Sequence, residues 1–336
     1  SSASGYNAPR VMSRNQDETT HGARDDAPEP DTGQENDLPE HLPTIVMSLA
    51  DAPPTAWSYR IAGLRLVTDL ECPQLRPLAI GSAPARLLAE PPRTPAGDFP
   101  VRRSTGLVGG ALRTVTCRPD PEGLRIEVAE VGEFTVAPDG SAVTGRTRGA
   151  DEDAFPEAAL GPALIVALAL RDILCLHAGA VRLAGAAVAF LGDSTAGKST
   201  LARLLAASDG CERLADDVLP VASTPRGLDA LPHFPQLKLP PEEQYPVAQP
   251  ERVPLAAAYV LDEGPDVEIE PLGPRDAMLA LMRQTVATRV FPPRLLARHT
   301  ELCARAVASL PVRRLSYPRR LDVGPEVAER IRHDLG

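Results

Sequence analysis

Residues 192–199 read Gly-Asp-Ser-Thr-Ala-Gly-Lys-Ser, and the fold of this 336-residue chain is inferred first from this stretch. Its glycines, lysine and serine match the pattern G-x-x-x-x-G-K-[ST]. An apolar segment at 186–191 (AAVAFL) precedes the motif, and 199–207 (STLARLLAA) has the residue spacing of a helix. The order strand, phosphate-binding loop, helix predicts a nucleoside triphosphate site in an α/β protein.

The chemistry of phosphate binding explains each residue type in this loop. Gly192 and Gly197 let the backbone turn its N–H groups toward phosphate oxygens, and the N-terminus of the helix adds a partial positive charge. Lys198 would reach the β- and γ-phosphates, and the Ser199 hydroxyl would bind Mg²⁺. We therefore expect ATP and Mg²⁺ to bind here. The residues expected to contact the nucleotide are Gly192, Asp193, Ser194, Thr195, Ala196, Gly197, Lys198, Ser199 and Thr200.

Two neighbouring carboxylates follow the loop at the end of a short predicted strand, Arg213-Leu214-Ala215-Asp216-Asp217. A strand–helix–strand crossover is expected to be right-handed with parallel strands. Both strands should therefore end at the same sheet edge, where ligands bind in α/β proteins. Adjacent residues on an extended segment point to opposite sides. We thus expect one of these two carboxylates to face the Mg²⁺–phosphate region and the other to face the substrate.

A histidine precedes the loop in the segment 176–183 (LHAGAVRL). The dipeptide Ala184-Gly185 is a plausible two-residue hairpin turn to the next strand. Pairing Leu183 with Ala186 sets a register in which paired residue numbers sum to 369. On that register His177 would lie opposite the first glycine of the loop, which makes it a candidate functional residue.

Three features at these spacings resemble the C-terminal domain of HPr kinase/phosphorylase, a bacterial serine kinase that acts on a phosphocarrier protein. They are His177, the loop at 192–199 and the segment 214–217 (LADD). The resemblance is close over about 176–221 and implies an α/β, HPr-kinase-like P-loop domain. It also implies catalytic roles for His177, Lys198 and Asp217, and a metal-binding role for Ser199.

A looser resemblance extends over residues 55–335, to HPr-kinase-related proteins of natural-product gene clusters, including kinases that modify lasso peptides. Its features are 59–70 (YRIAGLRLVTDL), 176–181 (LHAGAV) and 234–239 (FPQLKL). Thr200 stands where HPr kinases carry Glu, and their EIRGLG segment has no equivalent in this sequence. These departures argue against the phosphocarrier protein as the substrate and against the reverse phosphorylase activity. The looser resemblance favours a natural-product precursor peptide as the substrate.

The expected reaction is transfer of the γ-phosphate of ATP to a hydroxyl group, with a serine of a peptide or protein as the favoured acceptor. Asp217 would accept the hydroxyl proton as general base. His177 would orient Asp217 or stabilise the transferring group. Lys198 would neutralise the γ-phosphate, while Ser199 and Asp216 would hold Mg²⁺.

Two other functions stay open at this stage. A P-loop kinase for a small-molecule hydroxyl also places an aspartate after the strand that follows its loop. A non-kinase regulatory NTPase or transport ATPase would account for the apolar strand 256–261 (AAAYVL), which ends in Asp262-Glu263. We interpret that acidic pair as an ordinary strand end, because Asp216-Asp217 already fills the metal-binding role.

The chain divides into three expected regions. Residues 1–40 carry nine acidic residues, three arginines and almost no aliphatic ones, which predicts a disordered acidic tail. Residues 41–150 show alternating apolar residues, with a meander at 112–147, and predict a smaller β-rich (α+β) N-terminal domain. Residues 151–336 predict the P-loop domain. Helices are expected in it at 155–174, 275–288, 293–308 and 325–334.

Composition excludes several function classes. The net charge of −10 disfavours binding to nucleic acid, and no apolar run reaches the length of about 18 residues that predicts a membrane span. Five widely spaced cysteines and a polar N-terminus without a signal peptide predict a cytoplasmic protein. The expected partner is a peptide or protein, and a homo-oligomer is compatible with the sequence. Four arginines near the C-terminus are interpreted as solvated rather than as a site for an acidic peptide: Arg313, Arg314, Arg319 and Arg320.

Overall fold

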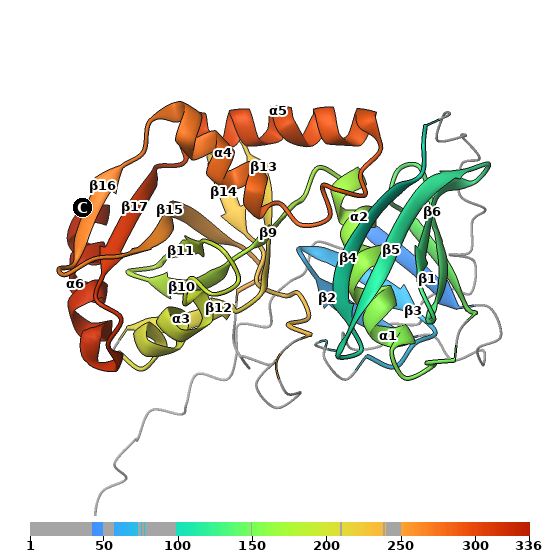
Figure 1. The fold of residues 1–336 in the computed structure, drawn as a ribbon, viewed down its shortest axis with the longest axis horizontal. Coiled ribbons are helices and arrows are strands. Elements are labelled where there is room, and N and C mark those ends of the chain that lie inside the picture. Colours follow the sequence, from blue (N-terminus) through green and yellow to red (C-terminus); the bar gives the residue numbers. More distant parts are fainter. Residues whose placement is uncertain are drawn as a thin grey trace, which may run out of the picture. The chain divides into compact units, whose positions relative to one another are not determined.

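The computed structural model describes most of the chain after the acidic N-terminal region. The described residues are 42–49, 57–72, 75, 77, 99–148, 150–208, 210–237, 239 and 250–336. The predicted disordered tail, residues 1–40, lies outside them. Residues 41–336 form one compact unit, and it contains two β-sheets (Figure 1).

The first sheet has eight strands in the order β2-β3-β1-β8-β7-β6-β5-β4. Strands β4 to β8 form an antiparallel meander. The alternation at 112–147 predicts β5 to β8, and β4 adds a strand that was not predicted. Strand β1 is parallel to both β3 and β8, so it joins the first hairpin to the meander. The strands are β1 (Thr44–Leu49), β2 (Trp57–Ile61), β3 (Leu64–Thr68), β4 (Arg102–Val108), β5 (Ala111–Asp120), β6 (Gly123–Val128), β7 (Gly132–Val136) and β8 (Ala142–Thr147).

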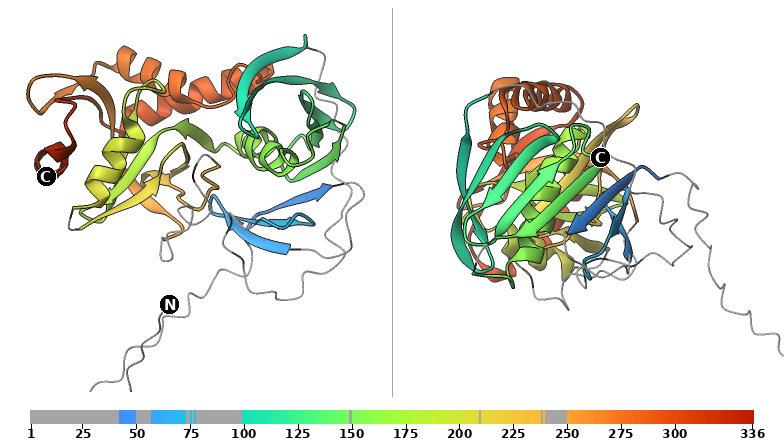
Figure 2. Two further views of the ribbon diagram at one scale, coloured as in Figure 1. Left: turned by 60° about the horizontal axis from the view of Figure 1, so that its bottom comes forward. Right: turned by 90° about the vertical axis from the view of Figure 1, so that its right-hand side faces the viewer.

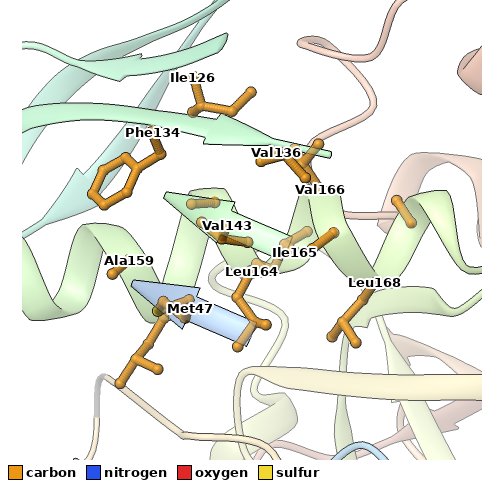
Figure 3. Close-up of a cluster of buried hydrophobic side chains, with 14 of the residues drawn as sticks. Met47, Ile126, Phe134, Val136, Val143, Ala159, Leu164, Ile165, Val166 and Leu168 are labelled. Carbon is orange, nitrogen blue, oxygen red and sulfur yellow. The ribbon is translucent and has the colours of Figure 1, made fainter. Parts of the chain in front are cut away.

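A buried helical segment packs against this sheet. It consists of α1 (Phe155–Ala158), the π-helical turn η1 (Ala159–Ala163) and α2 (Leu164–Leu170). The strands curve around it in Figure 2, and Phe134 and Leu164 lie in one shared apolar core (Figure 3). The predicted helix at 155–174 is therefore wrong at its C-terminal end, because the chain leaves the helix after Leu170 to begin the second sheet.

The second sheet is mixed, with nine strands. Seven follow the order β12-β10-β11-β15-β14-β13-β9, and β17 pairs with both β15 and β16. The pairs β11–β15 and β15–β17 are parallel, and the other pairs are antiparallel. The strands are β9 (Leu174–His177), β10 (Gly179–Leu183), β11 (Ala186–Leu191), β12 (Cys211–Ala215), β13 (Val218–Thr224), β14 (Gly227–Ala230), β15 (Val253–Glu263), β16 (Glu268–Pro271) and β17 (Val312–Tyr317).

Helices cover both faces of the second sheet. On one face, α3 (Lys198–Ala206) and α6 (Gly324–Leu335) pack on side chains such as Phe190 of β11. On the other face, α4 (Pro274–Gln284) and α5 (Pro293–Ser309) pack on the remaining side chains of the strands, such as Leu191 of β11. Alternate strand residues point to opposite faces, so β11 is apolar throughout because both of its faces are buried. This is an α/β arrangement, as the sequence predicts.

The C-terminal third differs from its prediction in one element. The three helices expected there are present as α4, α5 and α6, but β17 lies between α5 and α6 and was not predicted. A short helical turn, η3 (Leu321–Val323), precedes α6. Within the residues described, no helix is long and apolar enough to cross a membrane.

Candidate active site

The loop at 192–197 connects β11 to α3, and its backbone conformation depends on two glycines. Gly192 has φ 149° and Gly197 has φ 84°. Residues that carry a Cβ atom disfavour these values. A Cβ atom on Gly192 would lie 2.7 Å from the Cβ of Ala196, so the loop closes on itself tightly. The strand, loop and helix predicted from the motif are thus present in that order.

Lys198 is the first residue of α3, and its side chain folds back over the loop. The residue is only 4% exposed, and its Nζ donates hydrogen bonds to the carbonyls of Gly192 at 2.7 Å and Asp193 at 3.0 Å. Gly197 at the N-cap supplies no side-chain cap to the helix. The ammonium group and the N-terminus of α3 therefore put positive charge at the same loop, which suits an anionic ligand.

The remaining loop residues lie at the surface. Asp193, Ser194, Thr195 and Thr200 are exposed, and Ala196 is partly buried. Exposed polar residues with backbone N–H groups nearby are compatible with contacts to phosphate oxygens, as expected from the motif.

Arg319, which is expected from the sequence to be solvated, contacts this loop. Its guanidinium donates hydrogen bonds to the carbonyl of Ala196 and to the Tyr317 hydroxyl, and it lies 4.6 Å from the centre of the Tyr317 ring. Burial raises the pKa of Tyr317, although the charge of Arg319 opposes the shift. Arg319 therefore adds a third positive group beside the loop. The sequence signal was only a cluster of arginines, and the contact depends on the unpredicted strand β17.

Asp216 and Asp217 lie in the bend between β12 and β13, at the same sheet edge as the loop. Strand β10 is antiparallel to both β11 and β12, so β11 and β12 are parallel to each other, as predicted, although β10 separates them. The Ser199 hydroxyl donates a hydrogen bond to the Asp216 carbonyl at 3.3 Å. This contact joins the first turn of α3 to the acidic bend.

Gln236 holds this bend and was missed as a functional residue. Its Oε1 accepts hydrogen bonds from the backbone N–H groups of Asp216 and Asp217, both at 2.9 Å. Its Nε2 donates to the carbonyls of Val218 and Phe234, both at 3.0 Å. The side chain is buried, at 6% exposure. It lies within the segment 234–239 that supported the looser family resemblance, but nothing local in that segment indicates the contact.

The Asp216 side chain has the properties of a metal ligand. Asp216 is 6% exposed, and within the described part of the chain its buried Oδ1 has no hydrogen-bond partner. A buried carboxylate oxygen without a partner is costly, and a cation would compensate it. No group of three or more His, Cys, Asp and Glu side chains suited to a metal is found among the described residues. Mg²⁺ commonly uses one or two carboxylates together with phosphates and water, so Asp216 and Ser199 fit such an ion.

His177 reaches Asp217 by a route that differs from the predicted one. The predicted hairpin register is confirmed, since Leu183 pairs with Ala186. However, the ladder stops at Gly179, and His177 pairs with Val218 of β13 instead of lying opposite the first glycine of the loop. The chain changes neighbours at Ala178, whose N–H donates to the Asp217 carbonyl at 3.1 Å.

The His177 imidazole and the Asp217 carboxylate form a close pair. Nδ1 of His177 lies 3.0 Å from Oδ1 of Asp217 and also 3.0 Å from the backbone carbonyl oxygen of Asp217. The other ring nitrogen, Nε2, is buried and has no partner among the residues described. If Nδ1 carries the proton donated to Asp217, Nε2 is left as an acceptor. The pair can therefore hold or move a proton at Asp217.

Gln284, at the end of α4, connects the two halves of the site. With its amide nitrogen directed inward, it donates to the carbonyl of Gly192 at 3.1 Å and to that of His177 at 3.3 Å. A single buried amide thus sets the spacing between the phosphate loop and the histidine. The sequence contains no signal for this residue beyond its place near a helix end.

A cavity of about 330 Å³ opens at the His177–Asp217 pair. Its walls are mostly apolar and include Phe234 from the segment after β14 and Ile165 from α2. Such a volume lies at the small end of ordinary ligand pockets. The phosphate loop, the acidic bend and the cavity are therefore neighbours at one edge of the second sheet.

Comparisons with known proteins find a loose structural likeness. No protein-family model matches the chain, and no curated protein matches it. Among solved structures, the HPr(Ser) kinase/phosphatase from Coxiella burnetii is similar, with 13% sequence identity and a TM-score of 0.28. The match covers 48% of this chain and 95% of that one. A similarity at this level carries no information about activity.

Proposed function

We propose that this protein is an ATP-dependent kinase that transfers the γ-phosphate to a hydroxyl group, favouring a serine of a peptide or protein. One observation carries the proposal: three features meet at one sheet edge. They are a glycine-rich loop with a buried lysine, a buried Asp216 oxygen that has no hydrogen-bond partner among the described residues, and a histidine–aspartate pair. The donors of the loop suit the phosphates, and the His177–Asp217 pair suits a hydroxyl acceptor.

ATP would bind with its phosphates along the loop. The backbone N–H groups, the N-terminus of α3 and Lys198 would neutralise the phosphate charge, and Arg319 is near enough to contribute. Ser199 and Asp216 would hold Mg²⁺, which when bound neutralises charge on the β- and γ-phosphates. The buried Oδ1 of Asp216 supports this assignment.

Asp217 would act as the general base. Its carboxylate would accept the proton of the serine hydroxyl while the oxygen attacks the γ-phosphorus, and ADP would leave. His177 would be a positioning residue, since its Nδ1 lies 3.0 Å from the carboxylate and keeps that group toward the cavity. Catalysis would come mainly from positioning and charge neutralisation.

The regulatory NTPase is a weaker explanation of the same site. It would use Asp262 at the end of β15 as the metal-binding residue. That side chain is 58% exposed and lies 3.8 Å from Arg314, whereas Asp216 is buried beside Ser199. The small-molecule kinase shares every residue of the proposed mechanism and differs only in its acceptor.

Two matched aspartate variants test the proposal. We expect Asp217→Asn to lower phosphoryl transfer by at least about 100-fold, the usual loss for a general base, while ATP affinity stays nearly unchanged. Asp262→Asn, the control, should leave both quantities unchanged. The measurements are fluorescent-nucleotide binding and mass spectrometry of phosphorylated peptides.

Three results would contradict the proposal. Full turnover by Asp217→Asn would remove this residue from the mechanism. ATP consumption that needs no hydroxyl acceptor would favour the regulatory NTPase. Phosphate found on a metabolite instead of a peptide would favour the small-molecule kinase.

A natural-product precursor peptide, such as a lasso peptide, is the favoured acceptor because of the looser family resemblance. The five cysteines are free thiols, which supports a cytoplasmic location. Mass spectrometry of precursor peptides incubated with the protein and ATP tests the acceptor directly.

A further inference from the structure

Strand β4 (Arg102–Val108) is the terminal strand of the first sheet over the described residues. It pairs with β5 on one side, and within that part of the chain it has no paired strand on the other. An unprotected edge strand presents a row of backbone N–H and C=O groups that a further strand can bind. Proteins usually cover or blunt such an edge.

The register of the β4–β5 hairpin identifies the open backbone groups. Gly109 and Gly110 have φ 60° and 72° and form the turn between Val108 and Ala111, which pair with each other. In a two-residue hairpin the closing pair is hydrogen-bonded, and every second residue before it then points its backbone groups away from the partner strand. Those outward-pointing residues are Arg103, Thr105 and Leu107.

The cavity at the candidate active site runs along this edge. Five consecutive residues of β4, Ser104 to Val108, line it. The cavity lies on the inner face of the hairpin, because Val115 of β5, which pairs with Ser104, also lines it. Side chains alternate between the two faces of a strand, so contact with Thr105 and Leu107 as well extends the cavity to the backbone at the edge of β4. The same cavity is lined by His177 and Asp217. An unpaired strand edge therefore leads to the proposed general base.

Exposed apolar side chains and two arginines lie along the same edge. Leu107 is 50% exposed, and Leu112, which pairs with it across the hairpin, is 80% exposed. At the start of β4, the Nε of Arg102 is buried without a partner among the described residues, and Arg103 is exposed. An apolar surface with a positive end suits a peptide that carries apolar residues followed by a carboxylate.

We propose that β4 binds an extended peptide as an added strand, and that the bound peptide places its acceptor serine at Asp217. The proposal rests on the kinase function and names its substrate class: an unfolded peptide segment with apolar residues beside the serine and an acidic residue toward Arg102. Backbone hydrogen bonds to β4 would provide affinity, and the cavity would provide specificity. A small metabolite could not use the strand edge.

The probe is a library of decapeptides with one central serine and all other positions randomised without hydroxyl residues. Full-length protein, ATP and Mg²⁺ are incubated with the library, and phosphorylated members are identified by mass spectrometry. We expect the selected peptides to be enriched in apolar residues near the serine and in Asp or Glu toward one end. Amide exchange of residues 103–107 should slow when a selected peptide binds.

Backbone hydrogen bonds between β4 and the peptide can be removed by a change in the protein or by a change in the peptide. Thr105→Pro deletes an outward N–H at an edge position that tolerates proline, and it should raise the KM for a selected peptide about tenfold, as the loss of one backbone hydrogen bond can do. Thr114→Ala, at the exposed residue of β5 that pairs with Thr105, should behave like the native protein. A selected peptide N-methylated at alternate residues tests the same bonds without changing the protein.

The outcomes separate this inference from the kinase function. Unchanged KM values with Thr105→Pro and with the N-methylated peptide would overturn the edge-strand inference while phosphoryl transfer stands. ATP binding without phosphorylation of any library member would also overturn it. A protein that does not bind ATP would overturn the kinase function, and with it the inference.

Discussion

Gln236 determines the backbone conformation that carries both candidate carboxylates. Its side chain is buried and makes five hydrogen bonds: it accepts from the N–H groups of Asp216, Asp217 and Val218, and it donates to the carbonyls of Val218 and Phe234. Because one amide supplies both acceptor and donors, no apolar residue of the same size can replace it. The position of the proposed base thus depends on a residue about 20 positions away.

Gln236→Leu should destabilise the protein and impair the site together. It would leave two backbone N–H groups of the bend without their acceptor, at a cost of about 1–3 kcal/mol each when such groups are buried. The free energy of unfolding in urea and the rate of peptide phosphorylation measure the two effects.

Gln236→Glu is the matched control, measured at a pH low enough to keep the new carboxyl protonated: the C=O keeps the Oε1 acceptor, and the O–H supplies one donor to the carbonyls that Nε2 contacts. We expect it to lose less stability than Gln236→Leu. Equal losses in the two variants would mean that the N–H groups of Asp216 and Asp217 do not depend on this acceptor.

At the scale of elements, the phosphate loop and the turn of the β10–β11 hairpin each end in a glycine with the same positive φ angle. Gly197 and Gly185 both have φ 84°. Their surroundings differ: a Cβ on Gly197 would lie 2.6 Å from the guanidinium of Arg319, whereas a Cβ on Gly185 meets nothing within 4 Å. The two turns therefore separate the effect of backbone strain from the effect of the arginine contact.

Alanine at either glycine should cost about 1–2 kcal/mol of stability, the usual penalty for a side chain in the left-handed region. Only Gly197→Ala should also weaken ATP binding, because it displaces Arg319 from the carbonyl of Ala196. Urea unfolding and fluorescent-nucleotide titration distinguish the two effects. Equal ATP affinity in both variants would show that the Arg319 contact does not influence the loop.

For the whole molecule, the buried thiols are expected to lower the free energy of unfolding at alkaline pH. Burial raises the pKa of Cys72, Cys117 and Cys175 to about 12 in each case. In the unfolded chain these thiols ionise near their ordinary pKa of about 8.5. The unfolded state therefore releases protons that the native state retains, and the free energy of unfolding falls as the pH rises from about 9 toward 12.

We expect the native protein to be less stable at pH 10 than at pH 8, with each such thiol contributing on the order of 1–2 kcal/mol. Urea denaturation at the two pH values measures the difference, and Cys117→Val should reduce it. The buried thiols should also resist iodoacetamide until the protein unfolds. Rapid alkylation of all five cysteines in the native protein would contradict the burial.

Short-range patterns account for what could be predicted from the sequence. The loop at 192–199 is recognisable because phosphate binding requires glycines, a lysine and a hydroxyl at fixed spacing, and the hairpin register is confirmed because a two-residue turn leaves one pairing. The meander and the three C-terminal helices were also predicted from local periodicity. Strand β17 was missed because Arg313 and Arg314 interrupt its apolar pattern, although its other residues pack in the sheet.

Contacts between distant segments were decided only by the tertiary structure. His177 pairs with Val218 instead of following its own hairpin, Gln236 and Gln284 bridge elements far apart in sequence, and Arg319 reaches the loop through β17. The open edge of β4 likewise exists only in the assembled sheet. Sequence spacing determines conformation over a few residues, where the chain itself limits the choices. Which remote side chain satisfies a buried N–H or carboxylate depends on packing, because many residues could supply the same donor or acceptor.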